Sequence, residues 1–368
     1  RLAESVVMTD IEIIQLPIPA ALDGSAEARD FESTVDVRNA VGVASFGTDE
    51  MAFTAAELLP RWSNMEHEPK ILYVARIDGR IVARGVYEYR TGGEALDTTW
   101  HEVLVHPEFT GRGVGRVLAD AMEERAVAEG KARILVWANS PAGPGERLES
   151  PTGFGSLPAG NREVRFLLAR GFTLEQVERA SRLPLPVPAD ELATRRHAAE
   201  TAAGADYREL HWVGRTPERW REDIAHLLTR MSTDAPSAGL DEPEDPWTVE
   251  RLLAYEDKAA SSPRHELIAV VEHVPTGTLA GLTVLSVPPE LERPVSQEDT
   301  IVLKEHRGHR LGMLLKVANI LNLEEAYPGH PAITTFNAEE NRPMLDVNES
   351  VGFTPMAYIG AWKKVLRD

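Results

Sequence analysis

The stretch EVLVHPEFTGRGVGRVL, residues 102–118, joins a short apolar strand, a glycine-rich turn and the start of a helix. Such a turn brings several unpaired backbone N–H groups to one point at the helix N-terminus, where the helix dipole adds positive potential. Gly113 and Gly115 would let an anion approach the main chain with no Cβ in the way. The stretch therefore predicts an anion site, of the kind that holds phosphate groups.

A second stretch, DTIVLKEHRGHRLGMLL at residues 299–315, has the same plan, and Gly115 and Gly312 lie 197 residues apart. Three other pairs of segments recur in the same order. They are apolar hairpins at 72–89 and 267–286, buried strands at 133–139 and 332–338, and helices that end at Gly-Phe at 165–172 and 346–353. A repeat of this length predicts that the chain is a duplication.

In each repeat, helices and strands alternate, so we expect an α/β or mixed α+β class. The prediction is two tandem domains, 1–182 and 206–368, each with a mixed, mostly antiparallel sheet flanked by helices. The proline-rich stretch at 183–205 is predicted to be a linker that ends in a short helix. The first repeat also carries a Pro/Gly/Ser-rich insertion at 139–160, which indicates a loop over the substrate or a plain excursion.

Further helices are expected at 31–44, 57–68, 218–231 and 248–261, and a first strand at 11–17. Residues 1–10 lack the apolar core of a signal peptide, so we expect none, with Met8 as the native start.

Composition narrows the classes of function. The 368 residues carry a formal net charge of −19, which argues against a protein that coats nucleic acid. No apolar run is long enough to span a bilayer. The chain has no cysteine, which excludes thiolate nucleophiles and disulfides and fits a cytoplasmic protein. Eleven scattered histidines indicate no metal site.

Two familiar phosphate-binding loops fit the glycine-rich turn poorly. A Walker A loop needs GxxxxGK followed by Ser or Thr, and the turn has no such lysine. A Rossmann fingerprint needs GxGxxG early in a βαβ unit, whereas GRGVG at 111–115 has a different spacing and follows a hairpin.

The repeats resemble the GNAT superfamily of acyl-CoA-dependent N-acyltransferases, whose loop reads Arg/Gln-x-x-Gly-x-Gly/Ala after a strand. TGRGVG at 110–115 matches this pattern, with Thr110 where Arg or Gln is usual. RGHRLG at 307–312 also matches, with Arg310 in place of the middle glycine. The two-copy arrangement is similar to that of mycothiol synthases and related actinobacterial tandem acyltransferases.

The resemblance implies acetyl-CoA, or another acyl-CoA, as co-substrate, with its pyrophosphate on the loop. The residues implied in binding it are Leu104, Val105, Thr110, Gly111, Arg112, Gly113, Val114, Gly115, Arg116 and Asn161, and in the second repeat Arg307, Gly308, Gly312 and Asn341. The pantetheine arm is expected to pair with residues 103–105, where a bulge opens the sheet. A backbone N–H there would stabilise the oxyanion.

The resemblance also implies a carboxylate on the central strand as general base. Glu102 and Asp299 each lie thirteen residues before the last loop glycine of their repeat, so both are candidate catalytic residues. The alternative is an ordinary surface or ion-paired carboxylate. A structural or surface role is expected for the neighbouring His101 and His106.

The family often uses a Tyr before Gly-Phe as general acid, and here Leu167 and Asn348 hold that position. Neither can replace it. In the second repeat, the basic cluster at 306–310 indicates either phosphate contacts or an ordinary loop. Because Arg310 would obstruct the approach of a phosphate, we expect the first repeat to bind CoA and catalyse.

The function implied is transfer of an acetyl or short acyl group from CoA to a primary amine of a small molecule, directly within a ternary complex. The expected partners include no nucleic acid and no membrane. A monomer with pseudo-dimeric halves or a homodimer is expected. The alternative is a catalytically degenerate acyl-CoA-binding sensor or scaffold.

Overall fold

The structure is a computed structural model that describes residues 11–63, 65–91 and 93–367, without the side chains of 93 and 94. The expected start at Met8 lies outside the described residues. The chain divides into two compact units. Unit 1 holds the residues up to 92, 96–137 and the C-terminal residues from 364, and unit 2 holds 93–95 and 138–363.

Unit 1 is built on a sheet with the strand order β1-β2-β3-β4-β5. The strands are β1 (Glu12–Gln15), β2 (Lys70–Ile77), β3 (Arg80–Tyr89), β4 (Thr98–Val105) and the first residues of β5 (Arg133–Ser140). The helices are α1 (Ala26–Phe46), α2 (Ala55–Leu58) and α3 (Val114–Ala128). Neighbouring strands run antiparallel, except for the parallel pair β4–β5.

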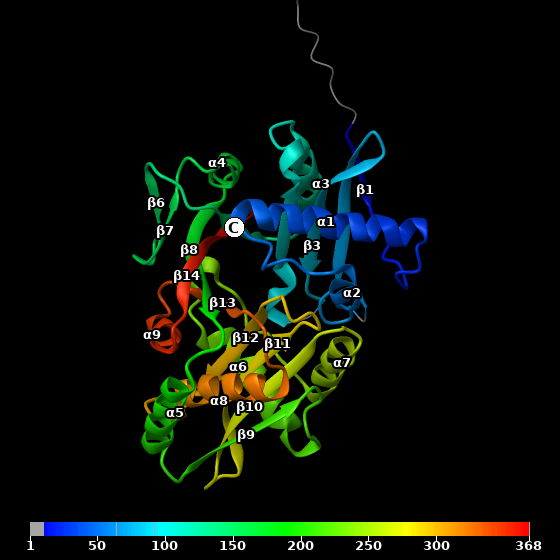
Figure 1. Cartoon of the computed structure of the whole chain (residues 1–368). Helices are drawn as coiled ribbons and strands as arrows, with labels where there is room; N and C mark the ends of the chain where they lie inside the picture. The colour runs from blue at the N-terminus through cyan, green and yellow to red at the C-terminus, as the bar shows by residue number, and fades with distance from the viewer. Residues whose placement is uncertain (1–10, 64, 92, 368) are drawn as a thin grey trace, which may run out of the picture. The chain divides into compact units, whose positions relative to one another are not determined.

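Helices α1 and α3 cover opposite faces of this sheet, and Figure 1 shows α1 lying across the strands. Side chains alternate along β3, so its residues divide between the two faces. Val86 packs with the α1 residues Phe31 and Val35, whereas a Cβ on Gly85 would lie 2.6 Å from Sδ of Met122 on α3. The apolar strand pattern and the two helices thus enclose one core on each face of the sheet.

The ends of the helices follow local sequence signals. Ser25 caps α1 by accepting a hydrogen bond from the Ala28 amide, and Gly47 ends the helix in the left-handed region. Thr54 and Glu57 form a capping box at α2. The helix expected at 57–68 is wrong in its length, because the chain turns into a 3-10 helix at Leu59–Trp62 that contains Pro60.

Unit 2 has the sheet order β14-β8-β13-β12-β11-β10-β9, with β12–β13 as its parallel pair. Its strands are β8 (Thr173–Pro184), β9 (Tyr207–Val213), β10 (His265–His273), β11 (Thr278–Val287), β12 (Val295–Val302), β13 (Ala332–Ala338) and most of β14 (Thr354–Val365). Its helices are α4 (Arg162–Ala169), α5 (Ala189–Ala203), α6 (Arg221–Asp234), α7 (Val249–Ala260), α8 (Leu311–Ala326) and α9 (Arg342–Val351).

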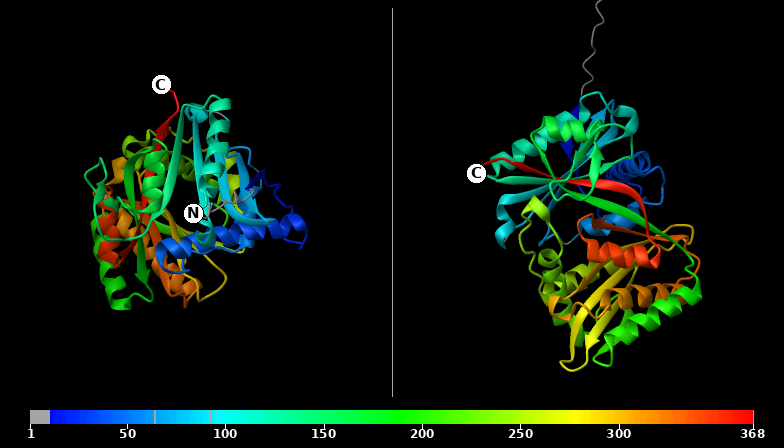
Figure 2. Two further views of the ribbon diagram at one scale, coloured as in Figure 1. Left: turned by 90° about the horizontal axis from the view of Figure 1, so that it is seen from above. Right: turned by 90° about the vertical axis from the view of Figure 1, so that its left-hand side faces the viewer.

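Helices α5 and α8 pack side by side in unit 2, as the right-hand view of Figure 2 shows, and α8 lies on β10 and β11. Helix α6 lies against β11 and packs on α7. Each face of the sheet has its own apolar cluster, one around Val317 and Ile320 of α8 and the other around Ile224 and Leu227 of α6. The mixed α/β class and the mostly antiparallel sheets are therefore confirmed.

Strand β8 belongs to the first repeat by sequence, but it lies between β13 and β14 of the second. The compact units therefore have different boundaries from the repeats. The units are defined by contacts in space, whereas the repeats are defined by similarity along the sequence. The boundaries 1–182 and 206–368 stay a prediction about the repeats. Helix α5 occupies most of the expected linker.

The insertion at 139–160 is not a structureless loop. It contains a two-stranded ribbon of β6 (Arg147–Glu149) and β7 (Ser156–Pro158), whose backbone groups pair with each other. Its composition hid this hairpin, because glycine and proline residues surround the two short strands.

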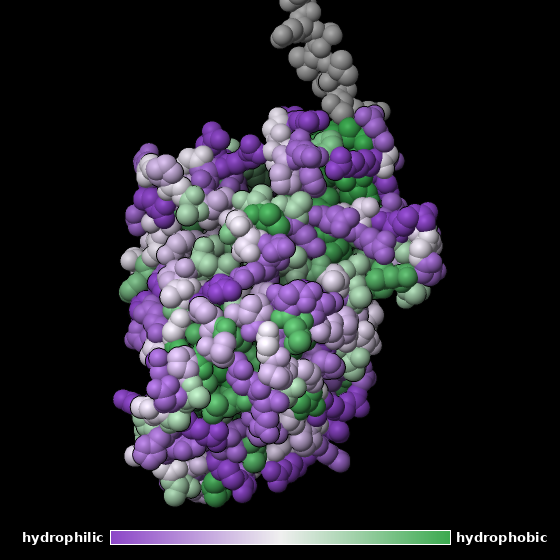
Figure 3. All heavy atoms as spheres, viewed as in Figure 1, coloured by the Kyte–Doolittle hydropathy of each residue, from purple (hydrophilic) through white to green (hydrophobic). Residues whose placement is uncertain are grey.

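No helix of the described ranges is long and apolar enough to cross a membrane. Hydrophilic residues cover most of the face seen in Figure 3, which agrees with the high content of charged residues.

Two glycine-to-alanine changes test the packing, because they should change the free energy of unfolding in opposite directions. A Cβ on Gly281 of β11 would lie 2.6 Å from the backbone oxygen of Ile301, which cannot move aside. Gly281→Ala should therefore lower the free energy of unfolding by about 1–3 kcal/mol. Gly42 lies inside α1, and a Cβ there would meet no atom within 4 Å. Gly42→Ala should therefore raise the free energy of unfolding by about 0.5–1 kcal/mol. Chemical denaturation measures both, and equal effects would contradict the packing described.

Candidate functional site

The central strands of unit 1 separate at the position where the sequence predicts a ligand. Strand β4 pairs with β5 only from Thr98 to His101, which lies opposite Val136. On its other side, β4 stays paired with β3 as far as Val105. The main chain of residues 102–105 thus lacks a ladder partner on the β5 side. An extended ligand can pair there as an added strand would.

The bulge expected at 103–105 is wrong. The register between β3 and β4 is unbroken from Tyr89–Thr99 to Ala83–Val105, so no extra residue opens the sheet there. The separation comes from the divergence of β4 from β5.

The loop after β4 delivers backbone N–H groups as the glycine pattern predicts. Gly111 and Gly113 have φ of 78° and 83°, values that L side chains rarely adopt. Gly113 is the N-cap of α3, and no side chain of the described residues caps this helix. The amides of its first turn, from Val114 to Arg116, therefore remain available to an anion.

The side chains of the loop fold back onto the loop itself. The Thr110 hydroxyl donates to the Pro107 carbonyl at 2.8 Å, and Arg112 Nη2 donates to the Glu108 carbonyl at 3.0 Å. The Arg112 guanidinium also lies 4.9 Å from the centre of the Phe109 ring. The side chains of Thr110 and Arg112 thus do not cap the helix, while Nη2 of Arg116 would lie 4.0 Å from a Cβ on Gly113.

Gly115 fixes the start of α3 against the end of β4. A Cβ at this position would lie 3.2 Å from Cγ2 of Val105. The close approach of helix and strand therefore requires that residue 115 has no side chain. It places the uncapped amides next to the end of β4, where Leu104 and Val105 pair with β3 but not with β5.

Glu102 of β4 forms an ion pair with Arg84 of β3. Oε1 of Glu102 lies 3.1 Å from Nε of Arg84, although neither atom completes a hydrogen bond among the described residues, so the two groups are poorly aligned. Arg84 is 6% exposed, whereas the Glu102 side chain is 36% exposed. The carboxylate therefore reaches solvent beside a buried cation.

The two histidines flanking this region occupy different environments. His101 is buried with its ring 5.0 Å from that of Tyr87. His106 precedes the 3-10 helix Pro107–Phe109, and its Nδ1 accepts from the Glu108 amide at 3.4 Å. Both positions suit the structural roles expected from the sequence.

Two central strands of unit 2, β12 and β13, also separate, and here β12 contains a bulge. Strand β12 pairs with β13 only at Val295 and Ser296. The register between β11 and β12 shifts by one residue between Thr283–Thr300 and Leu285–Gln297, which places Asp299 within the bulge. The expected bulge thus occurs in the second repeat rather than the first.

The second loop differs from the first in side chains and strain. Arg310 is the N-cap of α8 with φ of 56°, a left-handed conformation that costs a residue with a Cβ about 1–2 kcal/mol. Arg307 is held elsewhere, since its Nε donates to the Val302 carbonyl at 3.0 Å and its Nη2 lies 3.2 Å from Asp234. Gly308 also has positive φ, and Gly312 lies near Val347 of α9.

Asp299 has acidic neighbours. Burial raises the pKa of its carboxyl to about 6, and the charges of Glu298 and Glu266 add to the shift. Tyr255 donates a hydrogen bond to Glu266 at 2.8 Å. Asp299 is therefore a stronger base than an ordinary aspartate, which suits proton transfer near neutral pH.

The two asparagines implied in acyl-CoA binding, Asn161 and Asn341, both lie in unit 2. Asn161 precedes α4, and its side chain donates to Ser140 and Pro141 at 2.9 and 2.8 Å. Asn341 precedes α9, where its carbonyl accepts from the amide of Leu345. The structure thus does not bring Asn161 into unit 1 with the first loop.

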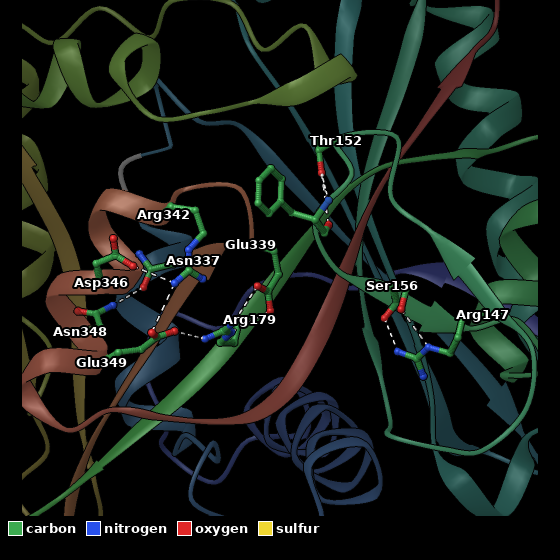
Figure 4. Close-up of polar contacts among 11 residues, drawn as sticks. Arg147, Thr152, Ser156, Arg179, Asn337, Glu339, Arg342, Asp346, Asn348 and Glu349 are labelled. Atoms are coloured by element: carbon green, nitrogen blue, oxygen red, sulfur yellow. Dashed lines mark hydrogen bonds and ion pairs between the residues drawn. The ribbon is translucent and has the colours of Figure 1, made fainter.

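Both residues that stand where a tyrosine was expected as general acid are buried. Leu167 packs in the interior, and Asn348 of α9 donates to Asn337 of β13 at 2.7 Å. Figure 4 shows this pair beside an ion-paired group in which Arg179 contacts Glu339 and Glu349. Neither position offers a proton donor like a tyrosine.

The sequence reasoning did not single out Arg84. A signal exists, because RIVARGVYEY at 80–89 has Arg84 in the middle of its apolar run, besides Arg80 and Glu88 near its ends. The matching strand TLAGLTVLSV at 278–287 carries no charge. Among the described residues, no group of histidines and carboxylates could hold a metal ion.

Comparisons with known proteins agree with the two-repeat architecture. The sequence model of the Acetyltransferase (GNAT) family matches residues 41–143. A mycothiol acetyltransferase from Thermomonospora curvata is 28% identical over 259 residues, which are 70% of each chain. An acetyltransferase from Pectobacterium atrosepticum is 30% identical over 110 residues, which are 26% of this chain and 74% of that protein.

One solved structure is similar over almost the entire chain. A tandem GNAT protein from the clavulanic acid biosynthesis pathway superposes with a TM-score of 0.72 at 22% identity, covering 97% of this chain and 98% of that one. This likeness supports the tandem fold.

The raised pKa of Asp299 predicts a pH-dependent loss of stability. The carboxyl is protonated in both states at low pH, and ionising it in the folded state costs free energy as pH rises through about 6. The wild type should therefore lose about 2 kcal/mol relative to Asp299→Asn between pH 4 and 7. Denaturation at several pH values measures the difference, and a constant difference would contradict the shift.

Proposed function

Because the chain belongs to the GNAT acetyltransferase family, we propose that it is an acyl-CoA-dependent N-acyltransferase. It transfers an acetyl or other short acyl group from CoA to the primary amine of a small molecule, directly within a ternary complex. The observation that carries the proposal is the uncapped N-terminus of α3 beside the unpaired main chain of β4.

The residues present fit an acyl-CoA. The first-turn amides of α3 would hold the pyrophosphate, since they are unpaired donors at the positive end of a helix. The main chain of residues 103–105 would hold the extended pantetheine arm. When bound, acetyl-CoA supplies the activated acetyl thioester. The N–H of Val105 would stabilise the negative charge that develops on the carbonyl oxygen, whereas that of Leu104 faces β3.

The attacking amine must be neutral, so a base has to take a proton from it. Glu102 is partly exposed on β4 and is the proposed base in unit 1. Its carboxylate is ion-paired with Arg84, whose Nε lies 3.1 Å from Oε1 of Glu102. Asp299, with its raised pKa, is the proposed base if unit 2 also catalyses.

The departing thiolate has no tyrosine to protonate it at Leu167 or Asn348. A thiol has a pKa near 8.5, so a thiolate is a reasonable leaving group at neutral pH. We therefore propose that it leaves without a tyrosine acid.

Unit 1 is the proposed catalytic half. Its loop has glycine at 111, 113 and 115, whereas Arg310 adopts a strained conformation at the start of α8. The match of the family model to residues 41–143 supports this choice. Similarity to mycothiol acetyltransferases supports acetyl transfer by a two-copy chain. We propose a monomer with pseudo-dimeric halves or a homodimer, which acts in the cytoplasm without nucleic acid or membrane.

The second candidate is an acyl-CoA-binding sensor without turnover, which the missing acids and the Glu102 ion pair favour. Thiol release from acetyl-CoA with a panel of amines, beside thermal-shift titration with CoA, separates the two. Binding together with thiol release supports the enzyme, and binding without release on any amine supports the sensor.

Two matched glycine changes test which loop holds CoA. Gly113 and Gly308 both have positive φ, and a Cβ would meet only Nη2 of Arg116 at 4.0 Å at the first and nothing within 4 Å at the second, so a glutamate strains the two backbones similarly. Gly113→Glu places a negative charge at the proposed pyrophosphate site and should weaken CoA binding at least about tenfold. Gly308→Glu should change it less than about twofold. Calorimetric titration with CoA compares them, and the reverse ranking would move the site to unit 2.

Glu102→Gln tests the base. Turnover at neutral pH should fall by about 10²–10⁴, and the loss should shrink at high pH, where more of the amine is already neutral. Glu88→Gln is the control, because Glu88 is also an ion-paired carboxylate of this sheet, bound to Lys70 and Arg90. An unchanged pH–rate profile in Glu102→Gln would remove Glu102 from the reaction.

A further inference from the structure

We propose that the amine acceptor of unit 1 carries a carboxylate, and that Arg84 and Arg38 recognise it next to Glu102. This inference rests on the proposed acyl transfer and names the class of acceptor. The evidence is a group of guanidinium side chains on the α1 face of the sheet, within an acidic chain.

Arg84 is a buried cation with an incomplete set of partners. It is 6% exposed, and its Nε faces Glu102 at 3.1 Å without forming a hydrogen bond among the described residues. A guanidinium carries five N–H donors in a planar fork that matches a carboxylate. Burying such a group is costly unless its donors are satisfied, so a poorly aligned ion pair leaves room for a better partner.

The fold itself does not need a charge at this position. Arg84 lies opposite Leu104 of β4. Leu104 precedes the N-cap Gly113 by nine residues. In unit 2 the corresponding residue is Leu282, which lies opposite Ile301 of β12. Ile301 likewise precedes the N-cap Arg310 by nine residues.

Leu282 is 1% exposed and packs with Trp220 and Ile224. An apolar side chain therefore fills this position well in the same architecture. The guanidinium in unit 1 has to be explained by something other than packing.

Further positive charge faces the same carboxylate. Arg38 of α1 is close enough to Glu102 and Arg84 for both charges to affect its pKa, which burial lowers to about 10. The guanidinium groups of Arg38 and Arg61 lie 4.7 and 5.5 Å from the centre of the Phe53 ring. Two arginines, Arg84 and Arg38, are thus close to Glu102. Arg61 and Glu57 are the other charged groups that affect Arg38.

This charge balance favours an anionic acceptor over a simple amine. A purely cationic amine would be repelled by the arginines, whereas an acceptor with a carboxylate can bind Arg84 through two parallel hydrogen bonds. Binding of that carboxylate would also compete with Glu102 for Arg84.

The counterpart of Glu102 in unit 2 has negatively charged neighbours instead of arginines. Asp299 has Glu298 and Glu266 as its charged neighbours. The preference for a carboxylate is therefore specific to unit 1, and Asp299 does not reproduce it.

The test compares amino acids with their amides as acceptors. Glycine, β-alanine and γ-aminobutyrate are each paired with the corresponding amide, and thiol release from acetyl-CoA gives kcat/KM. The wild type should prefer the acid of at least one pair by about 10- to 100-fold, the range expected for a hydrogen bond to a charged group. Equal kcat/KM within all three pairs, or a preference for the amides, would overturn the inference.

Arg84→Leu introduces the residue found in unit 2 and should reduce the preference to less than about threefold, mainly through KM of the acid. Arg84→Lys keeps the charge without the fork and should be intermediate; it serves if Arg84→Leu does not fold. Arg76→Leu is the control, because Arg76 also forms an ion pair within unit 1, with Asp30 at 2.6 Å. The control should keep the wild-type ratio. A preference retained in Arg84→Leu would overturn the inference.

A binding measurement separates this inference from the proposed catalysis. N-acetyl-β-alanine and its amide are titrated calorimetrically into the wild type and Arg84→Leu with CoA present. Tighter binding of the acid to the wild type alone, without turnover of any amine, would support the carboxylate site and reject the enzyme. Turnover with no difference in binding between acid and amide would support the enzyme and reject the carboxylate site.

Discussion

The divergence of β4 from β5 after the pair His101–Val136 is the constraint on which the site of unit 1 depends. Backbone amides and carbonyls need hydrogen-bond partners, so main chain that leaves a sheet pairing must find water or a ligand. Gly115 lets α3 start against Val105, which brings the uncapped helix amides beside this main chain. Adjacent parts of one backbone are therefore open to a strand-like arm and to an anionic group.

The two repeats share this frame and differ in the charges placed on it. Glu102 forms an ion pair with the buried guanidinium of Arg84. Asp299 stands in the bulge of β12 beside other carboxylates, which raises its pKa to about 6. The two repeats thus share the separation of strands, with Arg84 in one and Leu282 in the other at the matching position of the preceding strand.

Local signals explain which elements were predictable. The hairpins at 72–89 and 267–286 and the helices ending at Gly171 and Gly352 follow from apolar spacing and glycine positions, and the structure has them there. The errors have local causes too. Pro60 shortens the helix expected at 57–68, the hairpin β6–β7 lies within a glycine-rich insertion, and the bulge occurs at Asp299 rather than at 103–105.

The sequence by itself determined the duplication, the mixed α/β class and the glycine loop before α3, because each depends on the order and spacing of residues along the chain. Only the tertiary structure decided that Glu102 meets Arg84, that Asp234 holds Arg307, and that β8 lies between β13 and β14. These contacts depend on strand register and on packing between distant segments, and no local pattern of residue types specifies either.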